Sequence, residues 1–270
     1  MKNWKKYNGT LIPNNPPHFK VEESEKEIME LIKRTNSYFA RWCSDFDCNY
    51  ITDFWYVIND TPLKIEDYSI KVRNKIRKGL KEFDIIPINK DKFLEEAYQV
   101  YLSAIKSYNT GSVLLENEFV DSITPSETKI EFWGLYKNSK MVGYAIVKID
   151  FDVCEYESIK FNPSYLRLRP SEALIYTLNQ TYLNKRNFKY VNNGSRSLYH
   201  NTNFQFFLER KFKFRKAYCR MNIIYTPWVR LILTLLFPLK SFFSIFNNRI
   251  TNKIMVLIRH EKIRKSFLEQ

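Results

Sequence analysis

The sequence predicts an α+β fold in which a mixed, mostly antiparallel sheet is flanked by helices. Residues 128–136, 141–151 and 155–161 are rich in β-branched and aromatic residues and follow one another across short turns, which is typical of antiparallel strands. Residues 22–40 and 67–81 instead repeat apolar residues at helical spacing. A chain of 270 residues can bury a sizeable core, as one large domain or two small ones.

Before residue 83 we expect two helices and a strand. Acidic residues favour a helix start near residue 22, and the apolar stripe extends this helix to residue 40. The β-branched and aromatic run 52–59 predicts a strand. In the helix 67–81, six Lys and Arg surround an apolar stripe. This basic surface either binds phosphate or nucleic acid, or is an ordinary solvated helix face.

From residue 83 to residue 225 the expected order of elements is β, α, α, β, β, β, α, β, α, β. Alternation along the strand 155–161 places Glu157 and Phe161 on one face and Lys160 on the other. The other elements of this part are expected at residues 83–88, 91–107, 113–123, 170–184, 188–192, 202–211 and 214–225.

The balance of charge indicates an anionic partner. Lys and Arg number 43 against 29 Asp and Glu, so the formal net charge is +14. Nucleic acid, a membrane surface or a phosphate-bearing ligand would each match this charge. An aromatic content of 16% excludes an intrinsically disordered chain, and 6 glycines leave little room for a glycine-rich phosphate loop.

No metal site and no secretory signal are expected. Cys43 and Cys48 form the one close cysteine pair, their spacing is not that of a zinc finger, and the three histidines lie elsewhere in the sequence. Reduced thiols in the cytoplasm are the simpler interpretation. The amino end lacks the apolar segment of a signal peptide.

The last 45 residues form a basic, apolar tail. Residues 226–270 carry eight basic and two acidic residues, and their apolar part is interrupted by Arg230, Pro238 and Lys240. The longest uncharged run, Leu231–Leu239, is far shorter than the roughly 20 residues of a membrane span, so we expect none. A basic helix with an apolar face suits an anionic membrane interface. Packing on the core or a contact between subunits would also use such a helix.

The order of elements after residue 83 resembles the GNAT superfamily of N-acyltransferases. In the stretch 161–174, Phe161, Pro163, Tyr165 and Leu174 fall on the family's apolar, proline, aromatic and leucine positions. The resemblance implies that backbone N–H groups at the start of the following helix face the pyrophosphate of acyl-CoA, a co-substrate that Phe161 also contacts. A helix amino end favours an anion there.

The loop of this motif departs from the family pattern. Arg167 and Arg169 occupy the two glycine-type places, and Ser171 occupies the Gly/Ala place. Either the arginine side chains bind the phosphates, or the loop no longer binds CoA. The resemblance therefore implies Phe161, Arg167, Arg169 and Ser171 as cofactor-binding residues.

A second segment, residues 209–214, resembles the end of the family's fourth helix. Glu209 stands where the family often has a tyrosine that protonates the departing thiolate, and Lys213 replaces a glycine. The family's upstream asparagine falls at Thr202, next to Asn203, which is the further cofactor-binding candidate.

Residues 73–81 and the strand and helix after them are similar to the entry of the second half of Fem-type aminoacyltransferases, which build peptidoglycan cross-bridges. This likeness implies an aminoacyl-tRNA as the donor. We expect residues 1–82 to be an amino-terminal elaboration, 83–225 the GNAT-like core and 226–270 the helical tail.

Acyl transfer to an amine needs a base and stabilisation of an oxyanion. In the family a strand acid often serves as the base, and Glu157 is the nearest candidate. Tyr199 and His200 follow the strand 188–192 and would face the cleft, where His200 could act as a base near neutral pH. Each of them is also an ordinary candidate for a solvated or hydrogen-bonded residue.

The sequence therefore favours a cytoplasmic N-acyltransferase, working at the inner face of the membrane, with a small amine acceptor on an envelope precursor or sugar nucleotide. One alternative is an RNA- or tRNA-binding protein, since aromatic residues are interleaved with the positive charge. The other is a catalytically inactive GNAT-like scaffold docked on the membrane by its tail. The oligomeric state is left open.

Overall fold

The computed structural model describes residues 4–107, 113–123, 129–198, 203–239 and 249–267. The strands are β1 (Trp4–Tyr7), β2 (Thr10–Pro13), β3 (Phe39–Ser44), β4 (Trp55–Asn59), β5 (Asp84–Ile88), β6 (Lys129–Lys137), β7 (Lys140–Asp150), β8 (Val153–Phe161), β9 (Tyr190–Ser195), β10 (Arg215–Tyr218) and β11 (Arg220–Tyr225). The α-helices are α1 (Glu25–Arg34), α2 (Ile70–Glu82), α3 (Lys90–Lys106), α4 (Glu116–Ser122), α5 (Pro170–Asn179), α6 (Asn203–Phe212), α7 (Pro227–Leu236) and α9 (Arg249–Ser266). Shorter helical segments are η1 (Ile65–Asp67), η2 (Pro163–Leu168), η3 (Gln180–Lys185) and η4 (Phe237–Leu239).

The chain divides into two compact units. Unit 1 comprises residues 1–56, 195–203 and 216–270, and unit 2 comprises residues 57–194 and 204–215. This division follows contacts within the folded chain, whereas the boundaries expected from the sequence followed its motifs. The three-part scheme of elaboration, core and tail therefore stays a prediction.

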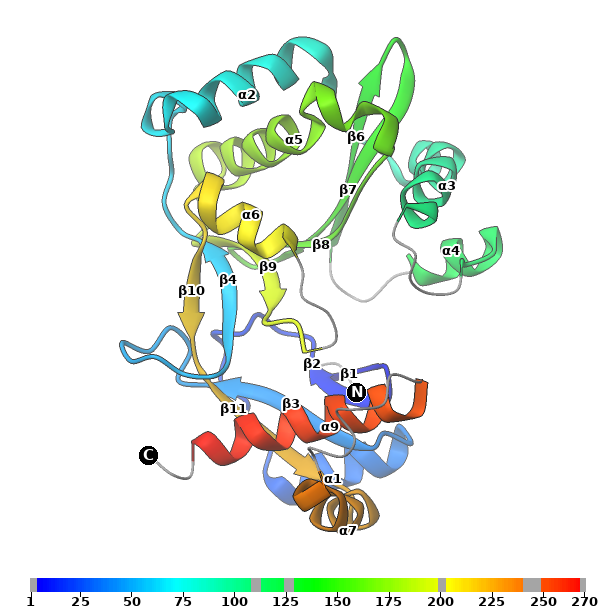
Figure 1. The fold of residues 1–270 in the computed structure, drawn as a ribbon, viewed down its shortest axis with the longest axis vertical. Helices are drawn as coiled ribbons and strands as arrows, with labels where there is room; N and C mark the ends of the chain where they lie inside the picture. The colour runs from blue at the N-terminus through cyan, green and yellow to red at the C-terminus, as the bar shows by residue number, and fades with distance from the viewer. Residues whose placement is uncertain (1–3, 108–112, 124–128, 199–202, 240–248, 268–270) are drawn as a thin grey trace. The chain divides into compact units, whose positions relative to one another are not determined.

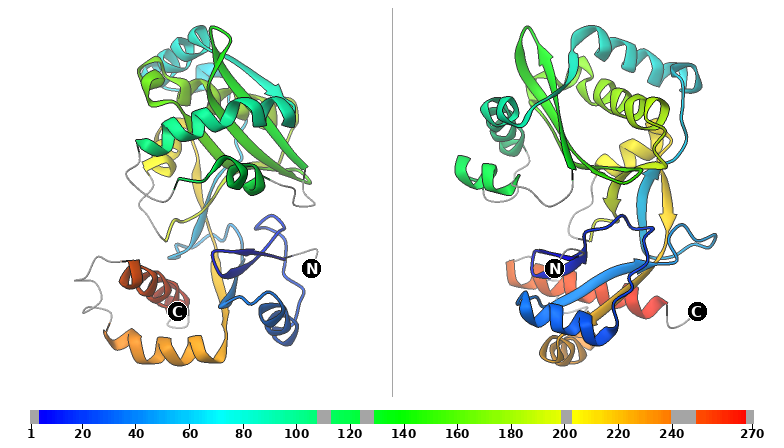
Figure 2. Two further views of the ribbon diagram at one scale, coloured as in Figure 1. Left: turned by 90° about the vertical axis from the view of Figure 1, so that its right-hand side faces the viewer. Right: turned by 180° about the vertical axis from the view of Figure 1, so that it is seen from behind.

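Unit 2 contains the GNAT-like layers. The seven-stranded sheet has the order β10-β4-β9-β8-β7-β6-β5, and β5 to β8 pair antiparallel along it, while β8 and β9 are parallel. Helices α3 and α5 lie on opposite faces of this sheet (Figure 1). The views of Figure 2 show the same layers from the side and from behind. This arrangement confirms the mixed, mostly antiparallel sheet flanked by helices that the sequence predicts.

An aromatic core fills the space between α3 and the sheet. Phe93 of α3 is fully buried, lies 4.5 Å from Phe132 of β6 and 5.1 Å from Tyr144 of β7 between ring centroids, and belongs to the largest buried cluster on this face. Rings at these separations pack edge to face or offset and add to the free energy gained by burial. The high aromatic content of the sequence therefore serves the core of this unit.

Helices α2 and α5 pack closely because Gly79 lies at their contact. A Cβ atom at Gly79 would meet the carbonyl oxygen of Arg169 at 2.4 Å and the Cβ of Ala173 at 2.8 Å. The two backbones can approach this far because glycine lacks a side chain. The basic helix of the sequence is thereby fixed against the first turn of α5.

Unit 1 is built on a four-stranded sheet of order β1-β2-β3-β11. Trp4 and Leu11 of its first strands pack with Ile28 and Ile32 of α1 in one buried cluster. Ser24 caps α1, and Glu27 completes a capping box with it. Helices α7 and α9 belong to this unit as well.

Three expected elements differ from the sequence pattern. The helix expected over residues 22–40 ends at Arg34, because Asn36 takes a left-handed conformation (φ 48°) and Phe39 pairs with Tyr225 in the sheet. The strand expected over residues 214–225 is interrupted at Cys219, and its two parts join different sheets. The helix expected over residues 170–184 continues to Lys185, but as a π-helix after Asn179. In the first two cases pairing with strands distant in the sequence decides the boundary.

No helix among the described residues is both long enough and apolar enough to cross a membrane.

Candidate functional site

The connection from β8 to α5 has a left-handed residue at a place where the family motif has glycine. Asn162 caps η2 by accepting a hydrogen bond from the Ser164 N–H at 3.0 Å. Arg169 then takes the left-handed conformation, with φ 71°, directly before α5 begins at Pro170. This region of φ favours glycine, and the sequence motif places Arg169 at a glycine-type position. Lys213, at the second position where the family has glycine, is also left-handed, with φ 58°.

No side chain among the described residues caps the amino end of α5, and Pro170 at its first position has no N–H to satisfy. Ser171 and Glu172 supply the next backbone N–H groups, which point along the helix axis toward its start. The helix dipole adds partial positive charge at the same place.

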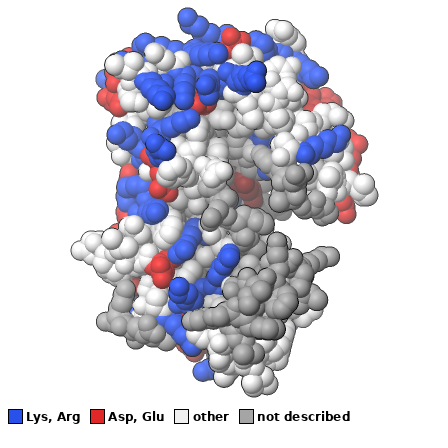
Figure 3. Space-filling view, viewed as in Figure 1, with Lys and Arg blue, Asp and Glu red and all other residues white. Residues whose placement is uncertain are grey.

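Cations surround this helix end. Lys211 of α6 forms an ion pair with Glu172 at 3.0 Å, and 5% of the Glu172 side chain is exposed. Burial, and then the nearby charges of Lys211 and Arg169, lower the pKa of Lys75 on α2. Like charges this close repel one another, and a bound anion would relieve the repulsion. Figure 3 shows Lys and Arg gathered over the part of unit 2 that holds α2.

The sheet opens beside this loop. The parallel ladder between β8 and β9 pairs Val153–Glu155 with Tyr190–Asn192, and both strands continue beyond its last pair. On the other edge of β8 the register with β7 shifts between Ser158 and Tyr156, so that Glu157 has no opposite residue and forms a bulge. Strands β8 and β9 therefore stop pairing after Glu155 and Asn192, next to the bulge.

The regular alternation expected along β8 is wrong at the bulge. Glu157 is exposed, and the extra residue moves Tyr156 and Ile159 to one face, because they lie opposite Val147 and Ala145 of β7. Lys160 lies opposite Tyr144 on the other face, where burial lowers the pKa of its ammonium group. The sequence gives no local signal for this bulge.

Four of the predicted cofactor-binding residues lie along the connection from β8 to α5. Phe161 is half-buried at the end of β8, Arg167 is exposed on η2, and Arg169 and Ser171 are half-buried at the start of α5. Asn203 is exposed at the first position of α6, whereas Lys211 near the other end of that helix contacts Glu172. Eight residues of helix separate the two positions by about 12 Å along the axis. Tyr199 and His200 lie outside the described residues.

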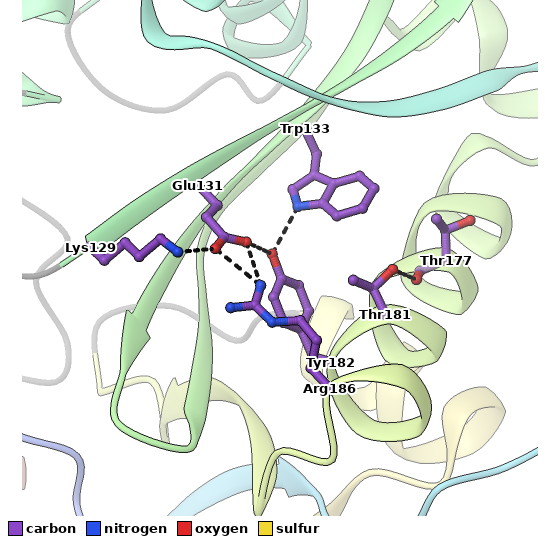
Figure 4. A network of polar contacts seen from close by, with 7 residues as sticks. All are labelled: Lys129, Glu131, Trp133, Thr177, Thr181, Tyr182 and Arg186. Carbon is purple, nitrogen blue, oxygen red and sulfur yellow. Dashed lines mark hydrogen bonds and ion pairs between the residues drawn. The ribbon is translucent and has the colours of Figure 1, made fainter.

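The opposite end of α5 is held by a polar network. The hydroxyl of Tyr182 donates to Glu131 of β6 at 2.8 Å and accepts from the indole N–H of Trp133 at 2.9 Å. Arg186 donates to both carboxylate oxygens of Glu131, at 3.0 and 2.8 Å. Figure 4 shows these side chains converging on Glu131 from β6 and from the helical segment after α5. The network ties the π-helix η3 to the sheet.

The same network sets the charge of Glu131. Burial opposes ionisation of the carboxyl group, but the hydrogen bonds from Arg186 and Tyr182 outweigh it and hold the pKa of Glu131 below its ordinary value. Burial raises the pKa of the Cys154 thiol well above its ordinary value, so this thiol is not a nucleophile near neutral pH. Among the described residues no group of His, Cys, Asp and Glu side chains is arranged to hold a metal ion.

No protein-family model and no curated protein matches this sequence. Solved structures with a similar fold do exist. FemX gives a TM-score of 0.58 at 9% identity, covering 86% of this chain and 85% of that chain. A structure described as the C-terminal domain of a lysylphosphatidylglycerol synthetase from Agrobacterium fabrum gives 0.54 at 11% identity, covering 86% and 84%. L-PGS from Bacillus licheniformis gives 0.50 at 12% identity, covering 86% and 83%.

At these identities the likeness concerns the fold. The chain has a GNAT-like fold with Fem-type likeness, as the residues of the loop and of α2 indicate. FemX and the synthetase domains match most of the chain, beyond the GNAT-like core by itself.

Proposed function

We propose that this protein is an N-acyltransferase that moves an acyl or aminoacyl group from a phosphate-bearing donor to an amine. One observation carries the proposal: the strands β8 and β9 stop pairing after Glu155, next to the bulge at Glu157, and a helix amino end with cations around it begins nearby in the chain. The phosphates of the donor would bind at the start of α5, and its acyl group would enter the opening between the strands. The fold supports the same reaction class.

The bulge supplies two groups that the reaction needs. Its extra residue leaves a peptide group outside the regular pairing of β7 and β8, and an N–H there can stabilise the oxyanion of the tetrahedral intermediate. The exposed carboxylate of Glu157 can accept a proton from the acceptor amine. As the amine nitrogen bonds to the acyl carbon, the bond to the ester oxygen or thioester sulfur of the donor breaks. The leaving group then takes up a proton.

The donor is acyl-CoA or an aminoacyl-tRNA, and the charges on α2 favour the longer anion. Six Lys and Arg on residues 67–81 exceed what one pyrophosphate requires, and Gly79 fixes this helix beside the loop. A polyanion bound along α2 would release counterions, so its affinity would fall steeply with salt. The acceptor in this proposal is a small amine on an envelope precursor or sugar nucleotide, in the cytoplasm at the inner face of the membrane.

The test is a transfer assay with each donor. Radiolabelled aminoacyl-tRNA or acetyl-CoA is incubated with the protein and a lysine-bearing envelope precursor, and amide product is separated and counted. Label in the amide product from one donor identifies it. Equal binding of charged and uncharged tRNA without product would support the RNA-binding alternative instead. Product from neither donor, with no shift in melting temperature by CoA at millimolar concentration, would support the inactive scaffold.

Glu157→Gln tests the assigned base. General base catalysis contributes about 10²–10⁴-fold, so transfer should slow by that factor while donor affinity stays unchanged. Glu155→Gln is the matched control, since Glu155 lies on the same strand within the paired part of the ladder. If both variants transfer at the same rate, Glu157 is not the base.

A further inference from the structure

Helix α7 is apolar except on one side, where Arg230 and Thr234 lie four residues apart, yet unit 1 buries only part of its apolar surface. Val229 and Leu233 are its buried side chains. A contiguous exposed apolar surface is ordinarily covered by protein or lipid. In both views of Figure 2, α7 lies at the outer edge of unit 1.

The uncovered side chains of α7 form one stripe. Trp228, Leu231, Ile232 and Leu235 are 52%, 63%, 39% and 65% exposed, and their spacing of three and four residues places them on one face. Tyr38 extends this face, since it is 52% exposed and its ring packs edge to face on Trp228 at 5.7 Å. We call these five residues the α7 face.

A hollow beside the α7 face continues its apolar surface. Trp228 and Ile232 line it together with Phe39 and Leu257, and its volume is about 560 Å³. His260 also lines the hollow. Burial, and then the charge of Arg41, lower its pKa to about 3, so its ring is neutral near pH 7. Its Nε2 then accepts from the Arg41 guanidinium at 3.1 Å.

Cations flank the other side of α7. A second hollow, of about 530 Å³, is lined by Arg230, Arg264 and Lys265, with Glu25 and Glu261 as its acids. Glu261 pairs with Arg264, and the Lys265 ammonium lies 4.0 Å from the centre of the Phe237 ring. The whole tail, 226–270, has eight basic and two acidic residues. The α7 face is therefore an apolar strip bordered by positive charge.

This pattern of charge decides between the partners that could cover the face. In a twofold contact between copies, the same surface faces itself, so the cations beside each α7 would face each other. An anionic bilayer instead offers acyl chains to the apolar strip and lipid phosphates to its basic border, as for helices that lie in the plane of the interface.

We propose that α7 docks this protein on an anionic lipid bilayer, with the α7 face among the acyl chains and Arg230 and Lys265 at the lipid phosphates. This inference deepens the membrane part of the proposed function and depends on that part alone. It concerns a surface of unit 1, whereas the donor site lies in unit 2.

The experiment compares two variants with the same change in charge. Leu231→Glu/Leu235→Glu alters the α7 face, and Ile51→Glu/Leu115→Glu alters two residues that are 78% and 65% exposed outside the tail and outside α2. The full-length proteins are sedimented with phosphatidylglycerol/phosphatidylcholine vesicles and with phosphatidylcholine vesicles. We expect the wild type to bind the anionic vesicles, the α7 variant to bind at least about tenfold more weakly, and the control variant to bind within about twofold of the wild type.

Insertion itself is measured by the fluorescence of Trp228, with Trp228→Phe as the reference, in vesicles of brominated lipid. Bromolipid quenching that the wild type shows and Trp228→Phe lacks supports the inference. Equal sedimentation of the two double variants would overturn it, and so would a wild-type dimer that dissociates in the α7 variant. Donor-dependent transfer to a water-soluble acceptor should be equal in both variants, so failure of the transferase proposal and failure of docking give different results.

Discussion

The two ends of helix α5 differ in whether their polar groups are bonded within the chain. At the carboxyl end, Glu131 accepts hydrogen bonds from Tyr182 and Arg186, and the helix is tied to β6. At the amino end no side chain among the described residues caps the helix, and Arg169 before it is left-handed. One end satisfies its polar groups within the chain, while the other leaves N–H groups available.

The difference indicates how a helix can be both rigid and open to a ligand. A capping side chain at the amino end would stabilise the helix by about 1 kcal/mol, but it would occupy the N–H groups that an anion needs. The network at the far end and the close contact at Gly79 hold the helix instead. The stability of α5 and its proposed binding role are thus carried by different residues, which mutations can separate.

The largest expected effect comes from breaking the carboxyl end. Glu131→Ala removes the acceptor of Tyr182 and Arg186. Hydrogen bonds to charged groups are worth roughly 1.5–3 kcal/mol each, and partial exposure reduces this, so the free energy of unfolding should fall by about 3 kcal/mol. Urea denaturation measures it, and donor affinity of the folded protein should not change.

Asp53→Ala is the control for this variant. It removes a more exposed ion pair, with Arg196 at 3.7 Å, and should change stability little, because exposed pairs are weak. Equal losses in the two variants would mean that the Glu131 network does not anchor α5.

The next effect tests the contact between α2 and α5. In Gly79→Ala the new methyl group meets the Arg169 carbonyl, and overpacking of this kind costs about 2 kcal/mol. Because the displaced atoms belong to the start of α5, donor binding should weaken as well. Thermal unfolding and donor titration measure the two effects.

Gly194→Ala is the matched comparison. A Cβ there meets no atom within 4 Å, but the backbone φ is 81°, so only conformational strain of about 1 kcal/mol should appear. Donor binding should stay at the wild-type level, and a loss as large as that of Gly79→Ala would contradict the role given to the helix contact.

Substitutions of Arg169 have a smaller expected effect. They distinguish the backbone conformation at the amino end of α5 from the charge of the Arg169 side chain. Arg169→Gly keeps the left-handed conformation and removes the guanidinium, so donor affinity should fall about tenfold, or 1.4 kcal/mol, without loss of stability. Arg169→Ala should lose the same affinity, and it should be less stable than Arg169→Gly by about 1 kcal/mol, because alanine keeps the Cβ atom that disfavours the left-handed conformation. If Arg169→Gly binds the donor like the wild type, the helix N–H groups act without the side chain.

The smallest expected effect is on pH dependence. Because the pKa of Glu131 in the folded chain lies below its ordinary value of 4.5, the unfolded state binds the proton first as the pH falls. The contribution of its charge is complete above about pH 4.5 and is lost as the pH falls through the lower, folded-state pKa. The stability difference between wild type and Glu131→Ala should therefore be smaller at pH 3 than at pH 6. If the stability difference is the same at pH 3 and pH 6, it comes from packing and neutral hydrogen bonds and not from the charge of Glu131.

The sequence could predict what depends on neighbours along the chain. The strands of residues 128–161, the basic helix with Gly79 and the motif from Phe161 to Leu174 follow from local periodicity and spacing, and the resemblance to GNAT and Fem-type enzymes rests on them. Helix boundaries failed where a distant strand intervened, as at Phe39, which pairs with Tyr225. A strand pair can override a helical pattern because its hydrogen bonds come from elsewhere in the sequence.

The residues of the candidate site also fall into two groups: those that the sequence could predict and those that it could not. Phe161, Arg167, Arg169 and Ser171 are neighbours in sequence, so their motif was enough to place them together. Lys75 and Lys211, which the fold brings to the same helix end, come from distant helices. No local pattern connects them.

The sequence by itself determined the order of elements from β5 to α6, the positive charge and the motif that begins α5, because each is a property of adjacent residues. Only the tertiary structure decided where β8 bulges, where its ladder with β9 ends and which side of α7 is exposed. These features depend on how residues far apart in the chain pack and pair. That is also why the proposed chemistry and the proposed docking surface could be located only in the folded molecule.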